Sequence, residues 1–260
     1  MKLLAVDVGN SRTSLALTED NEVTLRMDYQ TTTFGADEVA CLEAFLLAAE
    51  HAESAGIVSV VPDATENVRD VLKRYLPHLE THVVSHADVP MFTRYNQTTD
   101  LGIDRLVSSY AAYQLYAKPE NSPVIVVDFG TANTYNCVST SGEFLGGCIT
   151  LGVGATLRAL HQQTAKLPEV TMALPSAMLA TNTTDAMRAG VLLSVAGGMT
   201  AAIVLYTDIA FHGEDPVVVA TGGYAEMLRH YGAVMDIHDE NLLLEGVSMI
   251  TERILKERTF

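Results

Sequence analysis

Cysteine is scarce in this sequence, and its few cysteines form neither a disulfide pattern nor a metal pattern. The chain has three, Cys41, Cys137 and Cys148, an odd number at wide spacing without a CxxC pair. A disulfide framework or a zinc ribbon is therefore not expected. Only a short apolar run precedes Asp7, whereas a signal peptide needs roughly 7–15 apolar residues. We expect a protein of the reducing cytoplasm.

Basic residues are also few. The chain has 16 Lys and Arg residues against 32 Asp and Glu residues, which gives a net charge of −16. Such a chain repels the phosphate backbone of nucleic acids and the anionic surface of membranes. We therefore expect no nucleic-acid partner and no membrane partner, and any anionic ligand must be small and bound locally.

The sequence lacks a clear membrane-spanning run. Its longest apolar stretch, residues 190–206, contains Ser, Thr and the pair Gly197 and Gly198, and it is shorter than the roughly 20 residues of a membrane span. The stretch predicts a buried helix whose small residues let a neighbouring helix approach closely. We expect that neighbour to come from a second subunit, which makes the protein a homodimer.

Several well-known catalytic motifs are missing. The sequence has no GxxxxGK[ST] and no GxGxxG between a strand and a helix, which argues against a P-loop and against a dinucleotide site. HExxH and GxSxG are absent too, which argues against zinc proteases of that class and α/β-hydrolases.

What the sequence does contain is an internal repeat. The segment "AVDVGNSRTSLAL" at residues 5–17 returns as "VVDFGTANTYNCV" at residues 126–138, and an alignment without a gap matches Asp7 with Asp128, Gly9 with Gly130 and Thr13 with Thr134. One such Asp-x-Gly turn is typical of any β-hairpin. Two copies about half a chain length apart indicate a duplicated domain.

The domain boundary is predicted at a polar, proline-containing break, "AKPENSP", at residues 117–123. It gives a first domain at 1–117 and a second at 118–260. Each half reads as strands followed by alternating helices and strands, so the fold class is α/β. Beyond the repeat, we expect strands at 22–29, 55–61, 142–149 and 215–223, and helices at 36–52, 65–76, 154–167 and 240–257.

Three glycine turns suit a phosphate ligand. They are "DVGNSRT" at 7–13, "DFGTANT" at 128–134 and "ATGGYAE" at 220–226. Glycine lets backbone N–H groups come close to phosphate oxygens, which suits ATP. Asp7 and Asp128, facing each other across a cleft between two similar domains, could hold the cation that accompanies the phosphates.

An acidic and a basic residue begin a predicted helix between the first two turns. Asp104 and Arg105 follow a polar, aromatic segment that begins at Arg94. Asp104 is either a first-turn acid that interacts favourably with the helix dipole or a base that takes the proton of an acceptor hydroxyl in phosphoryl transfer. In the second case Arg105 could hold a substrate anion or the transferring phosphoryl group. The residues alone leave both interpretations open.

The motifs together resemble those of the type III pantothenate kinases, a family that includes proteins named Bvg accessory factors. The matching segments cover nearly the whole chain: 7–13, 95–106, 128–134, 146–160, 182–190, 221–223 and 241–247. The resemblance implies the fold of the actin, hexokinase and Hsp70 superfamily, with two ribonuclease H-like domains and ATP in the cleft between them. It also implies transfer of the ATP γ-phosphoryl group to the primary hydroxyl of pantothenate, the first step toward coenzyme A.

The resemblance assigns roles residue by residue. Asp104 matches the general base, and Asp128 matches the carboxylate that binds a required monovalent cation, K⁺ or NH₄⁺. Magnesium is implied with the nucleotide. The positions that match the pantothenate site are Tyr95, Gly102, Ile103, Asp104, Arg105 and Thr183. Those that match the ATP site are Asp7, Val8, Gly9, Asn10, Ser11, Arg12, Thr13, Ser14 and Thr131.

The sequence departs from the usual family motifs at two positions, and two functions other than pantothenate kinase remain open. Asn133 stands where the family usually has Thr, and Leu151 follows Thr150 where Pro is common, so we expect altered loop geometry there. The alternative functions are a non-catalytic regulatory protein on the same fold and a kinase for another small alcohol. Survival of the acids near the phosphate turns argues against a pure regulator.

His78, His82 and His86 recur at four-residue spacing and invite a metal-site interpretation. The neighbouring β-branched residues instead predict a strand, in which His82 and His86 only share a face.

Overall fold

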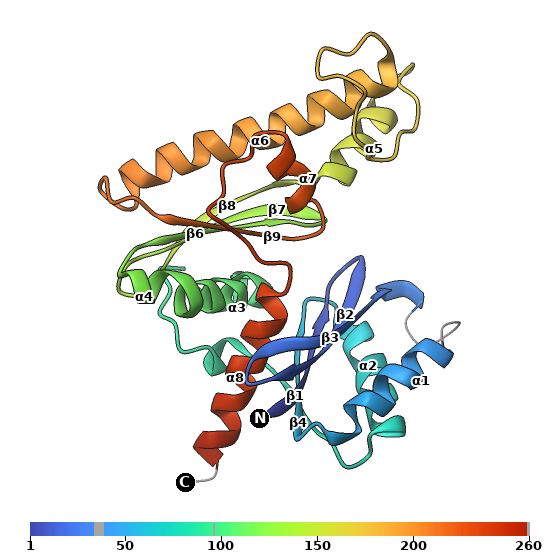
Figure 1. Ribbon diagram of the computed structural model, residues 1–260, viewed down its shortest axis with the longest axis vertical. Helices are drawn as coiled ribbons and strands as arrows, with labels where there is room; N and C mark the ends of the chain where they lie inside the picture. The colour runs from blue at the N-terminus through green and yellow to red at the C-terminus, as the bar shows by residue number, and fades with distance from the viewer. Residues whose placement is uncertain (34–38, 96, 259–260) are drawn as a thin grey trace. The chain divides into compact units, whose positions relative to one another are not determined.

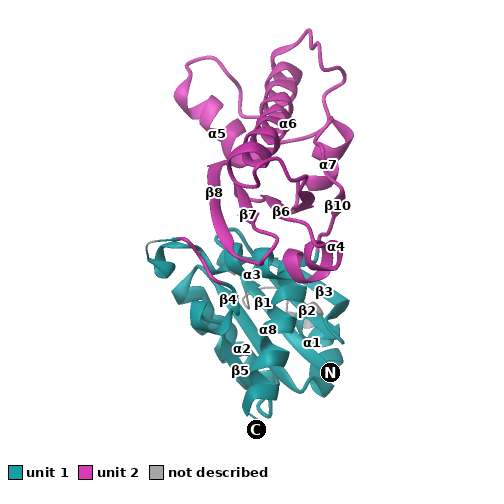
Figure 2. Cartoon of the chain, turned by 90° about the vertical axis from the view of Figure 1, so that its left-hand side faces the viewer, with its two compact units in different colours: residues 1–91, 95–111, 241–260 teal, residues 92–94, 112–240 magenta. Residues whose placement is uncertain are grey.

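The computed structural model describes residues 1–33, 39–95 and 97–258, and its chain forms two compact units (Figure 2). Unit 1 contains Met1–Met91, Tyr95–Ala111 and Asn241–Phe260. Unit 2 contains Phe92–Arg94 and Ala112–Glu240.

Unit 1 is built on a five-stranded mixed sheet with the strand order β3-β2-β1-β4-β5 (Figure 1). The hairpins β1–β2 and β2–β3 are antiparallel, whereas β4 and β5 join in parallel to β1 and to each other. Asp20 and Asn21 connect β2 to β3 with positive φ angles of 52° and 70°, the backbone that a tight hairpin turn requires. The strands are β1 (Lys2–Val8), β2 (Arg12–Glu19), β3 (Glu22–Gln30), β4 (Ser54–Ser59) and β5 (Glu80–Val83).

Helices cover both faces of this sheet. Helices α1 (Val39–Ala48) and α2 (Pro62–Tyr75) share a hydrophobic core with the strands, in which Phe45 and Leu72 meet Leu4. Helix α8 (Leu242–Arg258) packs on the other face so closely that a Cβ on Gly56 of β4 would lie 1.9 Å from Thr251 Oγ1. Helix α3 (Ile103–Ala112) packs against α8 at Gly246.

The two units do not divide at 117/118 as the predicted domains do, because the C-terminal helix belongs to unit 1. Residues 241–260 belong to unit 1, although they follow all of unit 2 in the sequence. Buried hydrogen bonds hold α8 there: the Ser248 and Thr18 hydroxyls lie 2.8 Å apart, and Ser248 Oγ donates to Asn21 Oδ1 at 3.0 Å. The predicted break at 117–123 is occupied by the last residue of a π-helical segment (Tyr113–Ala117), by α4 (Lys118–Glu120) and by the turn into β6 (Val124–Phe129).

Unit 2 repeats the sheet of unit 1. Its order, β10-β9-β6-β7-β8, places β8, β7, β6, β9 and β10 where β3, β2, β1, β4 and β5 stand, with the same pattern of antiparallel and parallel pairs. The shared topology supports the duplication inferred from the repeat. The remaining strands are β7 (Ala132–Val138), β8 (Phe144–Leu151), β9 (Val217–Thr221) and β10 (Ile237–His238).

The register corrects one detail of the repeat. Asp7 pairs with Ser14 across the first hairpin, whereas Asp128 pairs with Thr134 across the second. The first turn is therefore one residue longer than the second, and the alignment without a gap is wrong after the turn. The structural counterpart of Thr134 is Ser14, not Thr13.

Three helices pack on one face of the second sheet. Helices α5 (Val153–Gln163), α6 (Thr183–Ile209) and α7 (Ala225–His230) contribute Leu157, Met199 and Leu228 to a core that includes Phe129 of β6. The strands and helices predicted outside the repeat are present, with ends shifted by a few residues. The start of the predicted helix at 36–52 lies partly outside the described residues.

Helix α6 is only partly the buried helix that residues 190–206 predict. Val191, Leu192, Val195 and Met199 are buried in the core of unit 2, but the opposite face is open. By length and hydropathy α6 could span a membrane, yet a third of its most apolar window is buried within the protein, as expected for a helix that covers a sheet.

The strand predicted near the histidines is β5, which contains His82. His78 Nε2 lies 3.0 Å from the carbonyl oxygen of Glu50, and His86 Nε2 lies 2.6 Å from that of Leu101. These two histidines are therefore engaged with separate parts of the backbone.

Candidate functional site

The first glycine turn closes the hairpin β1–β2 in unit 1. The N–H of Gly9 donates to the carbonyl of Arg12 at 3.0 Å, and Thr31 braces the turn by donating its hydroxyl to the Gly9 carbonyl at 2.7 Å. Val8, Thr13 and Ser14 are buried, and they fix the two ends of the turn in the sheet.

The middle of this turn is open. Asn10, Ser11 and Arg12 are exposed, and the Asp7 carboxylate lies on the strand just before them, half-buried. Thr31 belongs to the site although no sequence signal pointed to it, because it comes from the far end of β3.

The second glycine turn lies in unit 2 and gathers residues from three loops. The N–H of Gly152, just before α5, donates to the Thr131 carbonyl at 3.2 Å, and the N–H of Tyr224 donates to the Phe129 carbonyl at 3.3 Å. A Cβ on Gly152 would lie 2.3 Å from the Gly130 carbonyl oxygen, so only glycine permits this contact. The predicted turns 128–134 and 220–226 thus meet within one unit.

The Asp128 carboxylate sits in the space that these glycines leave. A Cβ on Gly222 would lie 2.3 Å from Asp128 Oδ1, and one on Gly130 would lie 3.4 Å from it. Gly222 also has a φ of +89°, a conformation that other residues rarely adopt. The cradle fits a cation held by a carboxylate, which is the role implied for Asp128.

Such a cation could not rely on side-chain ligands alone. Among the described residues, no three His, Cys, Asp or Glu side chains gather closely enough to hold a metal ion. A cation beside Asp128 would complete its shell with backbone or hydroxyl oxygens, water or the phosphates of a nucleotide, all of which are suitable hard ligands.

Asn133, the departure from the usual family residue, is buried next to this turn. Its Nδ2 donates to the carbonyl of Leu151 at 3.0 Å, on the strand that leads into Gly152. The amide therefore joins β7 to the end of β8, a contact that the shorter side chain of Thr would not reach in the same way. The two departures, at Asn133 and Leu151, meet at one hydrogen bond.

The third group of residues begins with Tyr95 and continues into α3 in unit 1. Arg105 is buried, and its Nη1 donates to the Tyr95 hydroxyl at 3.1 Å while its guanidinium lies 6.0 Å from the centre of the Tyr95 ring. Ile103 is also buried and anchors the start of the helix in the core. The structure thus brings together Tyr95 and Arg105, which are ten residues apart.

Asp104 is half-buried at the first turn of α3, and glycine determines how its carboxylate lies. Asp104 Oδ1 accepts the backbone N–H of Arg105 at 2.9 Å. A Cβ on Gly102 would lie 2.5 Å from the same Oδ1, so a side chain at position 102 would displace the carboxylate. The second oxygen can then accept a proton or a hydrogen bond from a ligand.

Thr183 is the first residue of α6 in unit 2 and is exposed. Beside it, Asn182 caps the helix by accepting the N–H of Asp185 at 2.9 Å. Asp185 in turn accepts the hydroxyl of Ser176 at 2.5 Å and pairs with Arg188 at 3.5 Å, and these contacts tie the preceding loop to the helix.

The predicted site residues therefore form separate groups, each described within its own unit. Unit 1 holds Asp7 to Ser14 and Tyr95 to Arg105, whereas Asp128, Thr131 and Thr183 belong to unit 2. Thr31, Gly152, Gly222 and Asp185 are contributors that were not assigned from the sequence. Gly152, Gly222 and Asp185 lie inside motif segments of the sequence, so these segments could have indicated them, whereas Thr31 lies outside them.

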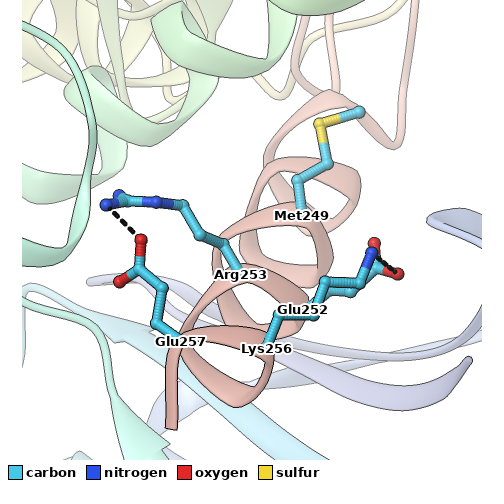
Figure 3. Close-up of a pocket in the computed structure, with 5 residues that line it drawn as sticks. All are labelled: Met249, Glu252, Arg253, Lys256 and Glu257. Atoms are coloured by element: carbon cyan, nitrogen blue, oxygen red, sulfur yellow. Dashed lines mark ion pairs between the residues drawn. The ribbon is translucent and has the colours of Figure 1, made fainter. Parts of the chain in front are cut away.

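Three cavities lie away from these groups. One of about 560 Å³ in unit 2 is lined by Arg94, Thr140 and Phe211, and one of about 420 Å³ in unit 1 by Leu46, Tyr75 and His78. A third, of about 240 Å³, runs along α8, where Arg253 pairs with Glu257 and Lys256 with Glu252 (Figure 3). None of the three contains a predicted site residue.

The buried thiol of Cys137 does not offer a nucleophile. Cys137 and Cys148 are free thiols, and burial raises the pKa of Cys137 to about 12. A thiol with such a pKa stays protonated at neutral pH, and only the thiolate is a strong nucleophile.

Comparisons with known proteins found relatives along nearly the whole chain. The family model of type III pantothenate kinase matches residues 3–204. The type III pantothenate kinase of Desulfatibacillum aliphaticivorans is 34% identical over 265 aligned positions, covering 97% of this chain and 98% of the relative. The type III pantothenate kinase of Rhodococcus jostii is 35% identical, with 96% of this chain and 95% of the relative covered.

Solved structures show the same fold. A conserved Baf family protein from Campylobacter jejuni aligns with a TM-score of 0.58 at 20% identity, over 98% of this chain and 100% of that one. The activator of 2-hydroxyisocaproyl-CoA dehydratase from Clostridium difficile, solved with bound ADPNP, aligns with a TM-score of 0.52 at 10% identity, over 100% and 98% of the two chains. The two five-stranded sheets and these structural neighbours confirm the predicted fold class of paired ribonuclease H-like domains.

The contacts of Asp185 predict a pH-dependent stability. The hydrogen bond from Ser176, followed by that from Asn182, lowers the pKa of Asp185 below its ordinary value of 3.8. A carboxyl group whose pKa is lower in the folded state contributes stability above its unfolded pKa and loses that contribution as the pH falls through the folded pKa. We expect Asp185→Asn to be less stable than wild type at pH 7, and the difference to shrink below about pH 4.

Urea unfolding of both proteins between pH 3 and pH 7 measures this difference. Asp215→Asn, an exposed acid in the same unit, serves as the control and should follow wild type throughout. A constant gap between wild type and Asp185→Asn across the whole pH range would contradict the prediction.

Proposed function

Because the chain belongs to the type III pantothenate kinase family and is therefore an ATP-dependent pantothenate kinase, we propose that Asp104 is the base of the reaction. In this proposal the Asp104 carboxylate accepts the proton of the primary hydroxyl of pantothenate while that oxygen attacks the γ-phosphorus of ATP. The observation that carries the proposal is the carboxylate geometry, with one oxygen held by the Arg105 N–H at 2.9 Å and the side chain only half-buried. Geometry of this kind orients a carboxylate for proton transfer.

Arg105 and Tyr95 are proposed to hold the acceptor. A guanidinium that is buried and already oriented by a tyrosine hydroxyl loses little freedom when it binds an anion, and pantothenate carries a carboxylate. Gly102 and Ile103 complete this part of the site, the first by leaving space for Asp104 and the second by anchoring α3.

The glycine turns are proposed to bind ATP. Residues Asp7 to Ser14 would approach the phosphates through the exposed middle of the first turn, and Thr131 would do so from the second. Backbone N–H groups at such turns favour anions without adding net charge, which suits a protein with a net charge of −16. Magnesium, bound with the nucleotide, would neutralise charge on the transferring phosphoryl group.

Asp128 is proposed to bind the monovalent cation, K⁺ or NH₄⁺. Its support is the glycine cradle around the carboxylate, in which Gly222 and Gly130 leave the space that the carboxylate occupies. The cation would offset the negative charge that the phosphates bring to this acidic protein.

The proposed active form is a cytoplasmic homodimer that associates through α6. The outer face of this helix exposes Leu193, Val204 and Leu205 at 67%, 67% and 53%. Gly197 and Gly198 lie between them in the sequence, and a Cβ atom added to either glycine would have no other atom within 4 Å. Apolar side chains beside glycines allow two helices to pack at short distance. Thr183 begins the same helix and is proposed to contact pantothenate.

Asp104→Asn should fold normally and lose turnover, because an amide cannot accept the hydroxyl proton. We expect kcat to fall by about 10²- to 10⁴-fold, the usual contribution of a general base. The measurement is ADP formation with pantothenate, ATP, Mg²⁺ and K⁺. Asp100→Asn, which changes an exposed acid four residues earlier, is the matched control and should keep the wild-type kcat.

The same assay with other small alcohols tests the acceptor. Faster turnover of a sugar than of pantothenate would overturn the acceptor assignment, and wild-type turnover of Asp104→Asn would overturn the base.

Asp128→Asn should weaken activation by the monovalent cation. The neutral amide lowers the charge of the ligand set, so we expect half-activation to need at least about tenfold more K⁺ than in wild type. Titrating K⁺ at saturating ATP and pantothenate measures the change, with Asp215→Asn as a control acid in unit 2. An unchanged K⁺ dependence would mean that another group binds the cation.

Val204→Asp should break the dimer, because association would bury a carboxylate in an apolar contact at a cost of several kcal/mol. Sedimentation equilibrium should show a dimer for wild type and a monomer for the variant. Val234→Asp, which changes another exposed apolar residue of unit 2, should remain dimeric. A dimeric Val204→Asp protein would place the interface elsewhere.

A further inference from the structure

We propose that His86 is a positioning residue for the Asp104 carboxylate and acts by holding the peptide bond that precedes the α3 helix. His86 Nε2 lies 2.6 Å from the carbonyl oxygen of Leu101, and a carbonyl can only accept, so Nε2 carries the donated hydrogen. The contact joins segments 15 residues apart. The inference rests on the proposed role of Asp104 as the base.

The His86 ring is itself held in place. Ser85 and Asp88 form a capping box around the short helical turn His86–Asp88, with the Ser85 N–H and hydroxyl donating to Asp88 Oδ2 at 2.8 Å and 2.6 Å. On the N-terminal side, the N–H of Val84 donates to the Ile57 carbonyl of β4 at 2.8 Å. The imidazole thus projects from a turn attached to the central sheet of unit 1.

The C-terminal helix braces the same turn. Arg253 of α8 donates through Nη1 to the Asp88 carbonyl at 3.1 Å, while its Nη2 pairs with Glu257 at 2.7 Å (Figure 3). Because α8 packs tightly on β4 at Gly56, the turn is supported from two directions. A donor mounted in this way can fix the direction of the group that it binds.

The group that it binds lies directly before the catalytic segment. Leu101 is 1% exposed in the core, and its carbonyl belongs to the peptide bond that joins it to Gly102. The Gly102 carbonyl accepts the Leu106 N–H at 3.2 Å as the first turn of α3 begins. Gly102 also lies against Asp104 Oδ1, where a Cβ would be 2.5 Å away. A rotation of the 101–102 peptide would therefore move the carboxylate.

We expect removal of the His86 donor to lower kcat and to leave the binding of ATP unchanged. Without the donor, the carboxylate samples orientations that do not reach the acceptor hydroxyl, and small displacements of a catalytic group lower kcat. We expect His86→Ala and His86→Phe to lower kcat by about five- to tenfold while the KM for ATP changes by less than about twofold. His86→Gln, which keeps an N–H donor on a side chain of similar reach, should recover most of the wild-type kcat.

His78 provides a matched control in the same unit. Its Nε2 lies 3.0 Å from the carbonyl of Glu50, the same kind of contact, but far along the chain from Asp104. His78→Ala, which removes an exposed contact to a backbone carbonyl, should leave kcat unchanged. This comparison separates a positioning role from a general contribution to stability.

A wild-type kcat in His86→Phe, a His86→Gln protein as slow as His86→Phe, or an equal loss in His78→Ala would each overturn the proposal. If His86→Ala does not fold, the pair His86→Phe and His86→Gln decides, because both fill the space of the imidazole. Wild-type turnover of Asp104→Asn would remove the premise, whereas an inactive Asp104→Asn beside a normal His86→Phe would remove only the role of His86.

Discussion

The site depends on one steric constraint: a carboxylate can lie against a tight backbone turn only where glycine leaves the space empty. This constraint recurs in both units. Gly102 leaves room for Asp104, and Gly130 and Gly222 leave room for Asp128. A methyl group at Gly102 or Gly222 would meet a carboxylate oxygen at 2.5 Å or 2.3 Å, whereas one at Gly130 would make an ordinary contact at 3.4 Å. The glycines thereby determine where the carboxylates of Asp104 and Asp128 can lie.

Duplication supplies the framework for Asp7 and Asp128, and the turns that follow these two acids differ. Both sheets place an aspartate near the end of the first strand, before a glycine turn. The first turn is one residue longer and is braced by Thr31, so its middle stays open. The second is shorter and is packed by Gly152 and Gly222 from two other loops, which encloses its carboxylate. An open turn suits extended phosphates, whereas an enclosed carboxylate suits a bound ion.

Helix α8, in which the chain returns to unit 1, contributes to the core of that unit and contacts the turn that carries His86. The helix buries Leu244, Val247 and Ile250, and burial of each such side chain contributes about 1.5–3 kcal/mol. The same helix sends Arg253 to the turn that carries His86. The element that completes the core of unit 1 therefore also supports the segment that leads to Asp104.

The sequence by itself determined the elements and the motifs, because these depend on local patterns. The apolar strands before Asp7 and Asp128, the glycines that follow them, and the helix that opens with Asp104 and Arg105 can all be found without coordinates. Tertiary structure alone decided which distant residues meet them. Thr31 reaches Gly9, Gly222 reaches Asp128, and residues 241–260 pack with the first unit because the register of the strands and the burial of α8 bring them there. Such contacts join residues that share no local pattern, and their energies depend on packing that a one-dimensional sequence does not display.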